Sequence, residues 1–110
     1  MKAKTRYVVV NTTLPNEAAA RGMAEKIVDA RLAACVQAMP IRSLYRWKGA
    51  VESADEILLL AKTRADLAGE LLAFIRRNHS YEVPEILVTP VLDGWPDYLR
   101  WIGEETAGGA

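Results

Sequence analysis

The sequence has a single cysteine, no surplus of charge and no long apolar run, and each of these shortages excludes a class of protein. Cys35 stands alone and cannot form an internal disulfide. Fourteen basic and fourteen acidic residues give a formal net charge of zero, so the chain lacks the positive field that attracts nucleic acid or acidic membranes. No apolar run approaches the roughly 18 residues of a transmembrane helix, and residues 7–10 are too short for a signal-peptide core. We therefore expect no nucleic-acid partner, no membrane partner and a cytoplasmic location.

The chain does have the composition and the length of one globular domain. It has 110 residues, of which 51% are hydrophobic and 25% are charged, and these values are typical of a folded protein rather than a disordered one. We therefore treat residues 1–110 as a single domain.

Strand-like and helix-like hydrophobic patterns alternate along this domain. The first half of the chain predicts a strand at 5–13, then a helix with Pro15 in its first turn and an apolar face of Ala20, Met23, Ala24, Ile27 and Val28. A strand at 32–39, interrupted by Pro40 and resumed at 43–47, leads through a turn at 48–50 into a strand at 51–62. The second half predicts a helix opened by Thr63 and Asp66 with a stripe of Leu67, Leu71, Phe74 and Ile75, a strand at 86–92, a short helix with Trp95, Tyr98, Leu99 and Ile102 on one side, and a flexible tail at 106–110.

The order strand–helix–strand–strand–helix–strand predicts an α+β, ferredoxin-like fold. In this βαββαβ arrangement two helices cover one face of a four-stranded antiparallel sheet. A short C-terminal helix follows the last strand. The strands at 41–47 and 51–62 form an extended hairpin, which is the unusual feature of the prediction.

That hairpin predicts an oligomer. About 12 extended residues span about 40 Å, whereas a helix of about 15 residues covers about 23 Å. The hairpin should overshoot the helices while carrying Leu44, Tyr45, Trp47 and Val51, and a neighbouring subunit would cover these side chains. The alternative is that the hairpin curls over its own sheet.

Five segments together resemble the CutA divalent-cation tolerance proteins. This resemblance implies a ferredoxin-like homotrimer similar in architecture to the PII signalling proteins and joined through the long hairpins. It also implies a link to tolerance of copper and other divalent cations, copper binding by some members and no firm enzymatic activity. The segments are residues 32–36, 43–49, 62–63, 81–86 and 97–101.

Cys35 and His79 are the candidate metal ligands, because thiolate and imidazole suit copper. They stand 79 − 35 = 44 positions apart without paired spacing, so one chain does not supply a four-ligand site. The chain also departs from the family at Asn11 and Phe74, where some members have cysteine, and at Ser80, where proline is usual. We expect no obligatory cofactor; copper or another divalent cation would bind weakly through His79 and carboxylates. Otherwise Cys35 is a small buried strand residue and His79 a polar residue at a helix end.

A polar cluster offers a second candidate site at positions that recur in the family. Glu56, Lys62, Tyr81 and Glu85 are expected at strand ends, where a cleft between subunits could bind a small anion or a hydrated cation. The alternative is a salt-bridge network that seals the interface. Trp47 is expected at the core of that interface.

The function expected from this resemblance is that of a non-catalytic trimeric divalent-cation tolerance protein. The alternatives are PII-like signalling through a small ligand, or a scaffold that docks an unknown protein. An acylphosphatase-like hydrolase shares the βαββαβ order, but its anion site needs an arginine and a glycine-rich turn after the first strand. Residues 12–16 contain neither.

Overall fold

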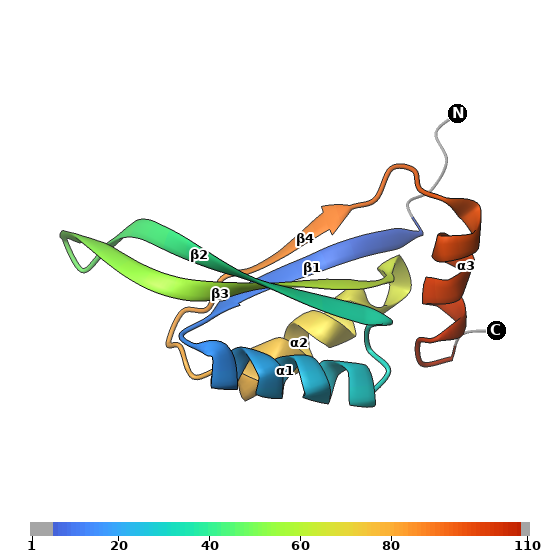
Figure 1. Ribbon diagram of the computed structural model, residues 1–110, viewed down its shortest axis with the longest axis horizontal. Coiled ribbons are helices and arrows are strands. Elements are labelled where there is room, and N and C mark those ends of the chain that lie inside the picture. The colour runs from blue at the N-terminus through green and yellow to red at the C-terminus, as the bar shows by residue number, and fades with distance from the viewer. Residues whose placement is uncertain (1–5, 109–110) are drawn as a thin grey trace.

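A four-stranded antiparallel sheet has two helices on one face and leaves its other face open (Figure 1). The structure, a computed structural model, describes residues 6–108. The strand order is β2-β3-β1-β4, which confirms the predicted ferredoxin-like α+β fold with its extra helix. Thr5, at the predicted start of the first strand, lies outside the described residues, as do positions 109–110 of the predicted tail. The elements are β1 (Tyr7–Leu14), α1 (Glu17–Asp29), β2 (Cys35–Trp47), β3 (Ala50–Arg64), a 3-10 turn (Ala65–Leu67), α2 (Ala68–Asn78), β4 (Ile86–Pro90) and α3 (Pro96–Glu104).

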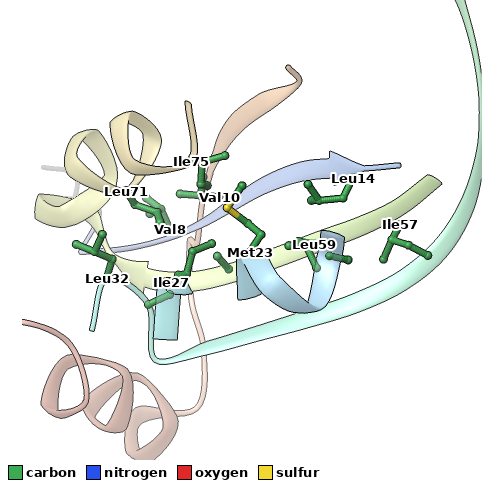
Figure 2. Close-up of a cluster of buried hydrophobic side chains, with 13 residues drawn as sticks. Val8, Val10, Leu14, Met23, Ile27, Leu32, Ile57, Leu59, Leu71 and Ile75 are labelled. Atoms are coloured by element: carbon green, nitrogen blue, oxygen red, sulfur yellow. The ribbon is translucent and has the colours of Figure 1, made fainter. Parts of the chain in front are cut away.

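The hydrophobic core lies between the sheet and the helices α1 and α2. Alternate residues of β1 and β3 face the helices because successive strand residues point to opposite faces. Figure 2 shows the helix side chains gathered against these strands. Val28 was predicted on the apolar face of α1 but is 45% exposed, because only one narrow stripe of the helix touches the sheet. The core residues include Val8, Val10, Leu14, Met23, Ile27, Leu59, Leu71 and Ile75.

Both predicted helix starts need correction. Pro15 is not in the first turn of α1, which begins at Glu17. Asn16 caps the helix: its Oδ1 accepts a hydrogen bond from the Ala19 N–H at 2.8 Å, and Pro15 precedes this cap. Thr63 does not open the second helix, because it is still paired with β1 inside β3. Asp66 accordingly does not form a capping box with it and instead accepts two hydrogen bonds from Arg64.

Pro40 does not interrupt β2. The strand runs without a break, and Pro40 stands in register with Ile57 of β3. β2 is an edge strand, and an edge strand tolerates proline where the missing N–H would point away from the ladder. The prediction of an edge was therefore right and the prediction of an interruption was wrong. The strand also begins at Cys35 rather than at Leu32, which packs in the core before it.

The β2–β3 hairpin extends well beyond both helices (Figure 1). Its strands are 13 and 15 residues long and join through a two-residue turn. Lys48 has φ 49° and Gly49 has φ 84°, the left-handed pair that a tight hairpin of this twist requires. Leu44 is 70% exposed and Val51 63%. The predicted overshoot is confirmed, and the hairpin does not curl back over its own sheet.

The end of the chain is packed rather than loose up to residue 107. Thr106 is 1% exposed, and its hydroxyl donates to the Ile102 carbonyl at 3.0 Å. The Ala107 N–H donates to the Arg31 carbonyl at 2.7 Å. These bonds hold the segment after α3 against the body, so the predicted flexible tail is wrong for these two residues. Along the described chain, no helix is long and apolar enough to cross a membrane.

Two further differences concern the last strand and helix. β4 ends at Pro90, two residues earlier than predicted, and Leu92 is 91% exposed. Of the four residues predicted on one side of α3, only Ile102 is buried, while Trp95 is 72% exposed. Most of the side chains on this side of α3 are therefore not buried within the chain.

Candidate ligand groove

A groove of about 620 Å³ runs along the hairpin from Glu56 to Trp47, which stands directly before the turn. Its walls come from residues 42–45 and Trp47 of β2, from Glu56 of β3, and from the segment 81–85 that leads into β4. Segments far apart in the chain thus bring together three of the four predicted pocket residues, Glu56, Tyr81 and Glu85. Trp47, predicted at the core of a subunit interface, lines the same groove. We call this feature the Tyr81 groove.

A hydrogen bond between Tyr81 and Glu56 forms the inner wall of the Tyr81 groove. The Tyr81 hydroxyl donates to Oε2 of Glu56 at 2.7 Å, and Glu56 is only 9% exposed. Burial, and secondarily the hydrogen bond to Glu56, raises the pKa of Tyr81 well above its ordinary value. The phenol therefore keeps its proton and remains a donor to the carboxylate.

His79 holds the backbone of Tyr81 in place. It follows the last residue of α2, where the chain leaves helical geometry. Its Nδ1 accepts from the Tyr81 N–H at 3.1 Å, so Nε2 carries the hydrogen that is donated to the Thr13 carbonyl at 2.8 Å. Both ring nitrogens are occupied, and a metal ion could bind this imidazole only by displacing one of these bonds.

Glu85 also lines the groove. Its Oε2 accepts from Nδ2 of Asn11 at 2.7 Å. Asn11 therefore orients this carboxylate from the neighbouring strand β1.

Lys62 is not part of the groove. Its Nζ donates to Oε1 of Gln37 at 2.6 Å and lies 5.8 Å from the centre of the Tyr98 ring. Across the strands it stands opposite Cys35. The described residues form four ion pairs, and none includes Glu56, Lys62 or Glu85. Within one chain, the salt-bridge network considered from the sequence is not formed.

Cys35 and His79 are at different places on the sheet. Cys35 is level with Lys62 and Val9, whereas His79 bonds at Thr13, four residues or about 13 Å further along β1. No group of three or more His, Cys, Asp or Glu side chains that could hold a metal ion is found in residues 6–108. One chain therefore does not assemble the candidate copper site.

Sequence reasoning missed several groove residues because none of them carries a ligand-binding motif of its own. They include Thr13, Arg42, Ser43, Glu82 and Val83. The hairpin register contains the signal for Arg42: Ile41 pairs with Glu56, so the residues that follow Ile41 border the same region. Thr13 enters through the fold of the 79–81 segment, which no local pattern predicts.

Comparison with known proteins identifies close similarity over nearly the whole chain. The family model described as "CutA1 divalent ion tolerance protein" matches residues 8–105. "Protein CutA" of Mus musculus is 44% identical over 95 residues, covering 86% of this chain and 54% of the relative. "Divalent-cation tolerance protein CutA" of Yersinia pestis is 44% identical over 96 residues, covering 86% and 81% respectively.

Solved structures agree with these sequence relatives. CutA1 from Oryza sativa superposes with a TM-score of 0.91 at 38% identity, covering 94% of this chain and 96% of that one. The divalent cation tolerance protein from Thermus thermophilus gives a TM-score of 0.88 at 41% identity, with 92% and 99% covered.

The relatives differ from this chain in length and from one another in location. The chain spans about half the length of the mouse and Arabidopsis thaliana proteins, 54% and 55%. The Arabidopsis protein is described as chloroplastic, and a structural neighbour from Archaeoglobus fulgidus as periplasmic. A cytoplasmic location for this chain thus stays a prediction.

Proposed function

Because this chain belongs to the CutA1 divalent ion tolerance protein family, we propose that it serves divalent-cation tolerance as a non-catalytic homotrimer that binds a small ligand in the Tyr81 groove. The observation that carries this proposal is the family match over residues 8–105. The geometry of the single chain adds support for each of its parts.

The open face of the sheet and the projecting hairpin support the homotrimer. Leu60 and Leu87 both stand opposite Asn11 of β1, so they share the face of the sheet that α1 and α2 leave uncovered (Figure 1). Leu87 is 57% exposed there and Met39 48%. A two-stranded ribbon without further cover is marginal in water. Packing the open faces and the hairpins of three chains together would shield both features.

The chemistry of the Tyr81 groove supports binding rather than catalysis. The buried carboxylate of Glu56 accepts a hydrogen bond from the Tyr81 hydroxyl, and the raised pKa of Tyr81 keeps that phenol protonated, so that it does not act as a base near neutral pH. A groove of this kind also favours a small-ligand role over a purely protein-docking scaffold.

Metal binding, in this proposal, belongs to the assembly and not to one chain. Cys35 stands opposite Lys62 on the open face of the sheet. A trimer that packs these faces together would bring copies of this thiol toward one another. His79 is already bonded through both ring nitrogens, so it is the weaker candidate for copper.

Sedimentation and calorimetry together test this proposal. We expect the purified protein to sediment as a trimer at micromolar concentration. Copper(II) titrated into it should bind, and Cys35→Ser should abolish binding while His79→Ala retains it. A monomer in sedimentation would contradict the assembly. Weak binding that neither substitution changes would contradict a specific metal site.

A further inference from the structure

We infer that the Tyr81 groove takes a small organic ammonium, a primary amine with an apolar body, rather than an anion or a bare metal ion. This inference rests on the proposed function, which places a ligand in this groove, and adds the chemical class of that ligand. Three properties of the groove carry it: charge, hydrogen-bonding polarity and shape.

The charge of the groove is negative. Glu56, Glu82 and Glu85 line it, and Arg42 is the one basic side chain among the lining residues. The Arg42 guanidinium already pairs with Asp55, with Nε 3.1 Å from Oδ1. Three carboxylates thus face a groove whose cation is engaged elsewhere, and an anionic ligand would be repelled.

The hydrogen-bonding groups at the inner wall are acceptors. The Tyr81 hydroxyl donates its hydrogen bond to Oε2 of Glu56, and no described residue donates to the other oxygen of that carboxylate. What remains for a ligand is the second, accessible oxygen of a carboxylate whose side chain is otherwise only 9% exposed, together with the lone pairs of the phenol. A ligand that donates satisfies them, and a primary ammonium carries three donors.

The rest of the groove suits an apolar body. Leu44, Tyr45, Trp47 and Val83 line it together with the polar groups. Aromatic faces attract cations, and the volume of about 620 Å³ falls in the range of small-molecule sites, about 300–1,000 Å³. A bare metal ion would need several converging ligands, and among residues 6–108 no such set exists. The groove therefore fits a cation larger than a metal ion.

Calorimetric titration of the full chain with three related compounds tests the ligand class. 2-Phenylethylammonium is the cation, 2-phenylethanol the neutral analogue and 3-phenylpropanoate the anion. We expect the cation to bind at least about tenfold more tightly than the other two, because only it forms charge-assisted hydrogen bonds with the groove. Glu56→Gln, which preserves shape and removes the charge, should weaken the cation at least about tenfold. Glu70→Gln removes the same charge from an exposed position in the first turn of α2 and should change binding by less than about twofold.

Sedimentation of the same samples separates this inference from the proposed function. Equal binding of all three compounds, no binding of the cation, or equal losses in Glu56→Gln and Glu70→Gln would overturn the inference even if the protein is a trimer. A monomeric protein would contradict the proposed assembly. In that case selective, Glu56-dependent binding of the cation to the single chain would still support the inference.

Discussion

Two regions of the sheet carry large apolar side chains in opposite surroundings. Where α1 and α2 cover it, Val10 and Leu71 are both 0% exposed, whereas Leu44 and Val51 in the hairpin are 70% and 63% exposed. Both regions are paired antiparallel β-structure. Their large apolar side chains differ in what lies against them. One region supplies the stability of the single chain, and the other leaves an apolar surface that the proposed trimer would bury.

Among the substitutions that test this difference, a charge introduced into the hairpin should have the largest effect, and the property that it changes is trimer formation. Trp47→Asp should prevent trimer formation, because each subunit would place an unpaired charge in the interface at about 3–5 kcal/mol. Trp47→Phe, which keeps an aromatic ring, should still assemble. Sedimentation velocity measures both. A fully trimeric Trp47→Asp would show that the hairpin is not the interface.

Truncation in the covered region should be nearly as costly. Leu71→Ala removes a fully buried side chain of the core cluster and should lower the free energy of unfolding by about 2–5 kcal/mol. Leu72→Ala is the matched control, because this neighbour on the same helix is 39% exposed and should cost less than about 1 kcal/mol. Urea denaturation gives both values. Similar losses would contradict the assignment of the core to one face of α2.

The smallest expected change in the free energy of unfolding concerns two buried threonines, one whose hydroxyl has no hydrogen-bond partner and one whose hydroxyl donates a hydrogen bond. The hydroxyl of Thr63 is buried without a partner, whereas that of Thr106 donates to Ile102. Thr63→Val should raise the free energy of unfolding by about 1 kcal/mol, since it replaces an unsatisfied hydroxyl by a methyl group. Thr106→Val should lower it by about 1 kcal/mol. Urea denaturation would contradict the comparison if both changes had the same sign.

Much of the fold follows from local patterns that the sequence displays. The alternation in β1 and the stripe of Leu67, Leu71 and Ile75 predicted a strand and a helix in the right places. The helix starts were harder, because Asn16 and Thr63 are both good caps by residue type. Pairing with β1 kept Thr63 in a strand, and such pairing is a long-range contact.

In the candidate site, too, residue types were predictable from the sequence, whereas the contacts between them were not. The residue types of Glu56 and Tyr81 marked them as candidates, and the structure joins them across 25 positions of sequence. Lys62 looked equally suitable but lies on another part of the sheet, bonded to Gln37. Strand register, which depends on the whole sheet, decides which polar residues meet.

By itself the sequence determined the order of the elements, the length of the hairpin and the absence of an internal disulfide, because periodicity, turn residues and cysteine number are local or compositional properties. Only the tertiary structure decided that Tyr81 bonds Glu56, that His79 is occupied by backbone groups and that Cys35 is far from it. These facts depend on the crossing of distant segments, and hydrogen bonds between such segments exist only once the sheet and helices have packed.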